Sequence, residues 1–111
     1  MAAVDAGSRF AALVDALSGE PGVALPDASG GRRFGADTLR VDGSIFAMAV
    51  QGRVVLKLPR ERVAELVDAG AGAPFENGSG RRMREWVALA GDPADDEALA
   101  REALAFVGAR R

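Results

Sequence analysis

Apolar residues near the start of the chain fall three or four positions apart, which is the spacing of an amphipathic helix. The pattern predicts a helix over Ser8–Leu17, with Ser8 as its N-cap and Gly19 as the residue after its C-cap. Residues 1–7 are expected to form a flexible N-terminus. The apolar stripe of this helix consists of Phe10, Leu13, Val14 and Leu17.

Two later segments show the same helical spacing. One covers Arg60–Ala69, where Pro59 suits the first turn because a helix leaves that N–H without a partner, and Gly70 suits the end. The other begins after Asp92-Pro93 and continues almost to the end of the sequence. We therefore expect three helices, one near each end and one in the middle.

Between the first and second helices the apolar period changes to two, which predicts strands. The segments are residues 38–41, 45–50 and 53–58. Asp42-Gly43 supplies the residues of a tight hairpin turn, and Gln51-Gly52 supplies a second one. These three strands form an antiparallel meander.

Two more strand segments follow the second helix. Met83–Leu89 alternates in the manner of a strand, and a short strand around Phe75 is expected to pair with it. The order α-βββ-α-ββ-α lacks the strand–helix alternation that builds parallel sheets. The predicted fold class is α+β, with two layers in which helices pack on an antiparallel sheet.

The expected register places apolar side chains on both faces of the meander. One face collects Leu39, Val41, Phe46, Met48, Val50, Val55 and Lys57, and the other collects Ile45, Ala47, Ala49, Val54, Leu56 and Leu58. A sheet with one covered face normally shows polar residues on the other. Either a bulge changes the register, or a loop, a helix or another protomer covers the second face. We favour another protomer, because broad apolar patches usually mark interfaces.

Composition limits the chemistry available to the chain. Its 111 residues suit one domain over residues 1–111, and 49% of them are apolar. The absence of cysteine and histidine excludes disulfides, thiolate nucleophiles, Cys/His zinc sites and a histidine base. We expect no cofactor and no enzymatic activity. The start has no signal-peptide pattern, and the longest apolar run, residues 45–50, is too short for a bilayer, so a cytoplasmic location without a membrane partner is expected.

Charge is distributed unevenly along the chain. The net charge is −2, which argues against a protein coated with basic groups for nucleic acid. Residues 32–62 nevertheless carry a net +4, and the acidic segments on either side carry −3 each. The basic centre leaves DNA binding open as an alternative function.

Six residues are candidates for binding: Arg33, Lys57, Arg81, Arg82, Arg84 and Trp86. Arg82, Arg84 and Trp86 are expected on one strand face, where they could contact a phosphate chain and a base, or form a local cation–π pair. Trp86 is more often a core residue in such a position. Lys57 could contact an anion, although a lone lysine in a strand more often extends to the sheet edge or pairs with a carboxylate.

The densest carboxylate cluster consists of Asp92, Asp95, Asp96 and Glu97. Its spacing could build a hard-metal site or an acid/base pair. The structural interpretation is stronger, because Asp92 suits a helix cap and the other acids complement the helix dipole. We therefore assign no catalytic or metal-binding residue, and an enzyme that uses this cluster or Lys57 is the least favoured function.

The order of several short segments resembles the TfoX/Sxy N-terminal domain family and the related MmcQ/YjbR group. The segments are Arg33-Phe34-Gly35, Val41 to Met48, Gly52 to Lys57, Pro74-Phe75 and Gly80 to Val87, and the resemblance covers about residues 8–108. It implies an α-βββ-α-ββ-α two-layer fold, without the C-terminal helical domain of longer members. TfoX/Sxy proteins regulate competence genes, and the family implies no catalytic residues.

Composition, the two-sided apolar sheet and this resemblance together predict a non-enzymatic regulatory or protein-interaction module, with a possible link to transcription or competence regulation. Its expected partner is another protein or a second copy bound through the sheet. The alternative is a DNA-binding protein of the MmcQ/YjbR type that uses basic strand hairpins. DNA is the less supported partner, because the net charge of the chain is negative.

Overall fold

The computed structural model describes residues 5–24, 37–50, 52–76 and 82–109, and it confirms the α+β fold class. The helices are α1 (Ala6–Leu17), α2 (Arg60–Asp68) and α3 (Asp96–Gly108), the last preceded by the 3₁₀ turn η1 (Pro93–Asp95). The strands are β1 (Val23–Ala24), β2 (Asp37–Val41), β3 (Ser44–Val50), β4 (Arg53–Lys57), β5 (Gly72–Glu76) and β6 (Arg82–Leu89). The element order matches the prediction, with the two-residue β1 added before the meander.

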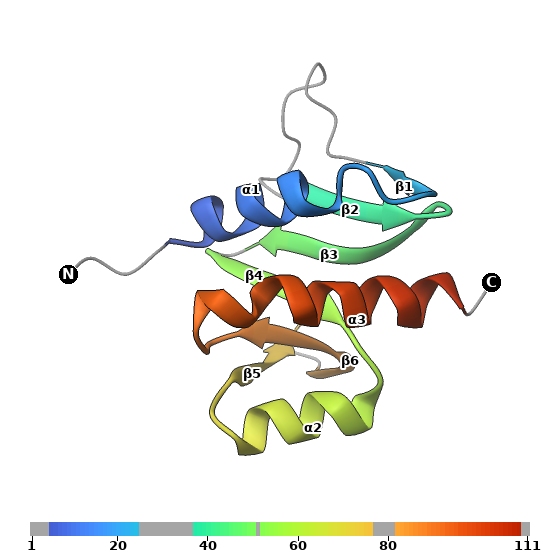
Figure 1. Ribbon diagram of the computed structural model, residues 1–111. Helices are drawn as coiled ribbons and strands as arrows, with labels where there is room; N and C mark the ends of the chain where they lie inside the picture. Colours follow the sequence, from blue (N-terminus) through green and yellow to red (C-terminus); the bar gives the residue numbers. More distant parts are fainter. Residues whose placement is uncertain (1–4, 25–36, 51, 77–81, 110–111) are drawn as a thin grey trace.

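The six strands form one antiparallel sheet in the order β1-β2-β3-β4-β6-β5. The β2-β3-β4 meander is continuous, and β6 joins it beside β4, so that β5 forms one edge and β1 the other. Figure 1 shows α1 and α3 crossing in front of the sheet, with α2 beside its β5–β6 end. None of the helices in the described segments is long and apolar enough to cross a membrane.

Helix α1 begins earlier than expected. The side chain of Asp5, and not that of Ser8, caps it by accepting a hydrogen bond of 2.7 Å from the backbone N–H of Ser8. A carboxylate at this position also interacts favourably with the helix dipole. Residues 5–7, expected within a flexible terminus, therefore form the cap and the first turn of α1.

Two turns adopt the conformations that their glycines indicate. Asp42 and Gly43 both have positive φ, 51° and 88°, as a tight hairpin of mirror-image type requires. Gly70 follows α2 with φ 77°, and its N–H donates to the carbonyl of Val67 while that of Ala71 donates to Leu66. This pair of bonds ends the helix in a Schellman motif.

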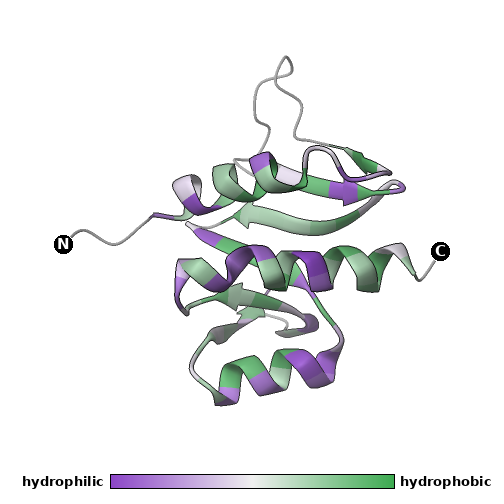
Figure 2. Cartoon of the chain, viewed as in Figure 1, coloured by the Kyte–Doolittle hydropathy of each residue, from purple (hydrophilic) through white to green (hydrophobic). Residues whose placement is uncertain are grey.

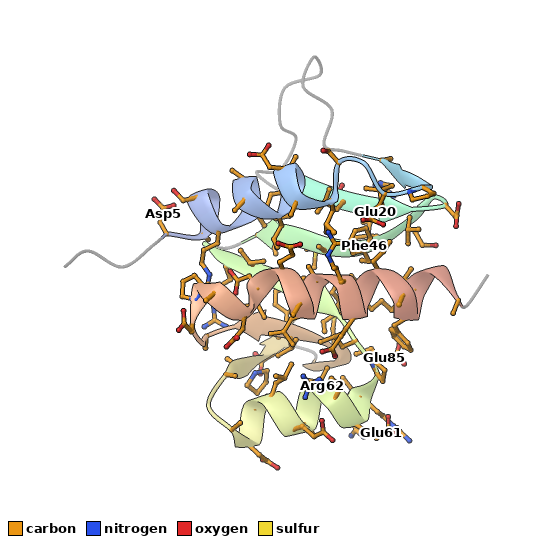
Figure 3. The ribbon with its side chains drawn as sticks, in the orientation of Figure 1. Asp5, Glu20, Phe46, Glu61, Arg62 and Glu85 are labelled. Carbon is orange, nitrogen blue, oxygen red and sulfur yellow. The ribbon has the colours of Figure 1, made fainter. Side chains whose placement is uncertain are left out.

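All three helices bury their apolar stripes in one core on the same face of the sheet. The helices supply Phe10, Leu13, Leu17, Val63, Leu66, Leu99, Ala100, Ala103 and Val107. Figure 2 shows hydrophobic and hydrophilic residues interleaved along α2 and α3, as amphipathic helices require. Phe46 of β3 is fully buried in this core and lies between α1 and α3 in Figure 3.

A bulge corrects the predicted assignment of side chains to faces. The β2–β3 register shifts between Leu39 and Arg40, so that Leu39 pairs with Ala47 and Arg40 pairs with Ile45. Phe46 is the extra residue, and it is buried in the helix-covered core together with Ala47. The prediction that Leu39, Val41 and Phe46 share a face with Met48, Val50 and Val55 is therefore wrong, because it assumed an unbroken alternation.

Candidate functional site

The face of the sheet opposite the helices has an apolar cluster of its own, called here the open face. Val55, Phe75 and Ala88 form its buried centre, and the partly buried Met48, Val50, Ala73, Met83 and Trp86 pack against them. Every member lies in a strand, and none of the described helices contributes a side chain to it. The structure thus contains both features that the sequence offered as alternatives, a bulge that changes the register and a second apolar face.

Strand pairing builds the open face as a row across four neighbouring strands. Met48 of β3 pairs with Val55 of β4, Val55 with Ala88 of β6, and Ala88 with Ala73 of β5. Paired residues in antiparallel strands point to the same face, which makes the row continuous. Val55 is fully buried and Ala88 nearly so, whereas Met48 and Ala73 at the two ends are partly exposed.

Lys57 and Trp86 form the next row on the same face. They pair between β4 and β6, and Lys57 Nζ lies 5.4 Å from the centre of the Trp86 ring, within the range of a cation–π interaction. Lys57 Nζ also lies 4.0 Å from Glu85 Oε1, at the limit of an ion pair. The Lys57 side chain is 29% exposed, so the cation remains accessible at the surface.

Two exposed arginines extend the positive charge of the open face. Arg53 pairs with Val50, a member of the apolar cluster, and Arg40 pairs with Ile45 across the β2–β3 hairpin. The strands carry five basic and three acidic residues, whereas the helices and η1 carry four basic and eight acidic residues. The strands are therefore net basic and the helices net acidic.

The predicted arrangement of Arg84 beside Trp86 is wrong. Met83 and Trp86 both pack on the open-face cluster, so alternation along β6 is broken between them. Arg84 instead lines a hollow of about 480 Å³ beside α2, together with Arg60 and Glu61. The cation that the structure places over Trp86 is Lys57 from the neighbouring strand.

The structure does not describe the side chains of the remaining three predicted binding residues. Arg33 and Arg81 lie outside the described residues. Arg82 begins β6, where it pairs with Glu76, and its side chain is also outside the described part of the chain. Of the six predicted binding residues, the structure thus brings Lys57 and Trp86 together and places Arg84 elsewhere.

The carboxylates around Asp92 lie at the start of a helix, as the structural interpretation of this cluster predicts. Asp92 caps η1 by accepting a 2.9 Å hydrogen bond from the N–H of Ala94, and Asp95 occupies the N-cap position of α3. The start of α3 lines a hollow of about 180 Å³ beside α2 that also includes Arg62 and Glu102. Among the described residues, no group of three or more carboxylates is placed to hold a metal ion.

Asp96 is the one acid of this cluster that is buried, and it binds Arg9. The guanidinium of Arg9 donates to both carboxylate oxygens, at 2.8 Å and 2.7 Å, and to the carbonyl of Gly91 at 3.2 Å. The hydrogen bonds to Asp96 raise the pKa of Arg9. This bidentate ion pair connects α1 to the start of α3 and so holds these two helices together.

Sequence reasoning missed part of the site. The apolar character of both faces was visible in the alternation of 45–58. The strands of Phe75 and Met83 were predicted too, but the face on which these two residues lie was not, because they lie beside register breaks in β5 and β6. Arg40 and Arg53 did carry a signal, since each occupies a position that alternates with buried residues.

Comparisons with protein-family models, curated proteins and solved structures give no match for this chain. The resemblance to the TfoX/Sxy and MmcQ/YjbR families therefore stays a prediction from the short segments named above.

Proposed function

We propose that this chain is a non-enzymatic protein-interaction module whose binding surface is the open face. The observation that carries the proposal is the apolar row Met48-Val55-Ala88-Ala73, which crosses four strands with no described helix over it. An apolar surface of this kind, bordered by charged residues, is typical of interaction sites.

The composition of the open face supports this function. Methionine, aromatic residues and arginine are enriched at protein interfaces, and the face combines Met48, Met83 and Trp86 with the exposed Arg53. The partly exposed apolar side chains of Met48, Ala73, Met83 and Trp86 surround the buried centre and are the ones that a partner would cover. By contrast, the carboxylates near Asp92 are engaged in caps and an ion pair.

A regulatory role is the biological form of this proposal. The resemblance to the TfoX/Sxy N-terminal domain supports a link to transcription or competence regulation, because proteins of that family act as regulators. Such a module would act by binding another protein.

The test compares two Ala-to-Glu variants of matched chemistry. Ala73→Glu places a charge at the end of the apolar row, and Ala11→Glu places the same charge on the exposed surface of α1. A partner captured by the wild type should be retained by Ala11→Glu and lost by Ala73→Glu, and binding of the purified partner should change the fluorescence of Trp86, the only tryptophan. The proposal would be contradicted if Ala73→Glu, with an unchanged circular dichroism spectrum, still captured the partner and still showed the change in Trp86 fluorescence.

DNA binding is a second candidate, favoured by the position of Arg40 and Arg53 on strands that form hairpins, on the same face as Lys57. Each phosphate contact should contribute about −0.9 to the slope of log affinity against log salt. Arg53→Gln should therefore reduce that slope by about one unit in a mobility-shift titration. No shift of duplex DNA at low ionic strength would dismiss this candidate.

A further inference from the structure

We propose that the open face binds an amphipathic helix whose apolar stripe is flanked by acidic residues. This inference rests on the proposed function and specifies the chemistry of the partner.

Charge is the first argument. Arg40, Arg53 and Lys57 all belong to the open face, and Lys57 lies 4.0 Å from the carboxylate of Glu85. The apolar cluster is therefore bordered mainly by cations. A partner with carboxylates beside its apolar stripe would complement this border and would be attracted to it before contact.

The width of the apolar row is the second argument. Neighbouring strands lie about 4.8 Å apart, so the row over β3, β4, β6 and β5 is about 14 Å wide. A helix with its side chains is about 10–12 Å across, so one helix would cover most of the row. The opposite face of β3 and β4 shows that two of these strands accept such a partner, because α3 packs there through Leu99, Ala103 and Val107 while Glu97 and Glu102 remain exposed.

An added strand is a poorer occupant than a helix. The β5 edge of the sheet contains Pro74, which has no N–H to donate to a new strand. At the other edge, β1 is only two residues long. The apolar face therefore offers more contact than either edge.

A second copy of this chain and DNA are the competing occupants. Two open faces packed together would bring Arg53 and Lys57 of one copy toward the same cations of the other, an arrangement that repels. Phosphates would meet the cations but gain nothing from the partly exposed apolar side chains of Met48, Met83 and Trp86. The combination of apolar surface and cations thus favours the acidic amphipathic helix.

The test uses three synthetic 18-residue helical peptides with the same leucine stripe and with glutamate, glutamine or lysine beside it. Binding is followed by peptide fluorescence anisotropy and by the emission of Trp86. Three rim ion pairs of up to about 0.5 kcal/mol each predict that the glutamate peptide binds ~10-fold more tightly than the glutamine peptide, and that the lysine peptide binds more weakly than both. High salt should reduce that ratio.

Two charge-reversal variants locate the effect. Arg53→Glu reverses a charge on the open face and should reduce that affinity ratio ~3-fold. Arg60→Glu makes the same change on the helix side and should leave the ratio unaltered. Both side chains belong to exposed residues, so neither variant should lose its fold.

Each result that contradicts this inference overturns a different part of it. Equal affinity for all three peptides would overturn the acidic partner but leave the interaction face intact. Failure of every peptide to bind would overturn the helix as occupant, and the Ala73→Glu comparison then decides the proposed function separately. A dimer in sedimentation velocity that Ala73→Glu dissociates, or duplex DNA that binds more tightly than the glutamate peptide, would likewise overturn this inference.

Discussion

The same strands form both faces of the sheet, but helices cover one face and none of the described helices covers the other. On one face Phe46, Leu56 and Val87 are fully buried beneath helices. On the other, Val55 is as deeply buried as Leu56, yet its neighbours Met48 and Trp86 remain partly exposed. Alternation of apolar residues therefore shows that both faces avoid water, but it does not show what covers each one.

The side chains themselves differ between the faces. The helix-covered face uses mainly leucine, valine and phenylalanine, which pack in defined rotamers. The open face adds methionine, tryptophan and a lysine over the tryptophan ring, side chains that tolerate both water and a partner. The difference suits one face for stability and the other for binding.

The largest effect on this comparison should come from truncating its most buried aromatic residue. Phe46→Ala removes a fully buried side chain and should lower the free energy of unfolding by about 3–5 kcal/mol. Met48→Ala, two residues further along the same strand but on the open face, should lower it by about 1 kcal/mol, because Met48 is only partly buried. Urea unfolding measures both, and equal losses would refute the distinction between the faces.

Breaking the ion pair of the helix layer should have the next largest effect. In the Arg9–Asp96 pair the side chains are 13% and 8% exposed, so Asp96→Ala leaves a nearly buried guanidinium without its carboxylate and should destabilise by about 3 kcal/mol. The exposed Arg62–Glu102 pair is the control, and Glu102→Ala should change stability by less than about 1 kcal/mol. Comparable midpoints of thermal unfolding for the two variants would contradict the assignment.

A smaller effect is expected where α2 meets the sheet edge. A Cβ added to Gly72 would lie 2.5 Å from Val87 Cγ2 and 3.4 Å from Leu66 Cβ, so Gly72→Ala should destabilise by about 1–3 kcal/mol through overpacking. At Gly19 the added atom meets nothing within 4 Å, and Gly19→Ala should be neutral within about 0.5 kcal/mol. Neutrality of both variants would show that α2 does not press on this strand.

The smallest effect concerns pH and the exposed cap of α1. The hydrogen bond from the backbone N–H of Ser8 lowers the pKa of Asp5 from its ordinary value of 3.8. The stability from the charged cap is then complete above that value and is lost as the pH falls through the lower, folded-state pKa.

Asp5→Asn tests this dependence, because asparagine keeps the cap without the titrating group. The difference in urea midpoint between wild type and variant should be constant from pH 5 to 7, values chosen well above the ordinary pKa, and should shrink on acidification below it. A difference that grows on acidification would contradict the direction of the pKa shift.

Regular periodicity explains which parts of the fold could be predicted. The stripe of Phe10, Leu13 and Leu17, the Asp42-Gly43 turn and the end of α2 at Gly70 are each encoded within a few residues. They were therefore visible in the sequence, and the structure confirms them. The start of α1 was misplaced because Asp5 and Ser8 are both good caps, and local sequence does not say which one the helix uses.

The candidate site was predicted less well, because it depends on register. A single extra residue at Phe46 changes the face to which its side chain points, and the break in β6 separates Arg84 from Trp86. The contact of Lys57 with Trp86 joins strands that are 29 positions apart along the chain. Such partners follow from the order of strands in the sheet, which residue spacing alone does not specify.

The quenching of Trp86 by acrylamide tests most directly whether the open face is accessible to solvent and to a partner. In the isolated chain at micromolar concentration, we predict solvent-sensitive emission that acrylamide quenches readily, and protection from quenching when the glutamate-flanked peptide is added. A tryptophan already shielded in the isolated chain, and unchanged by the peptide, would contradict an open face.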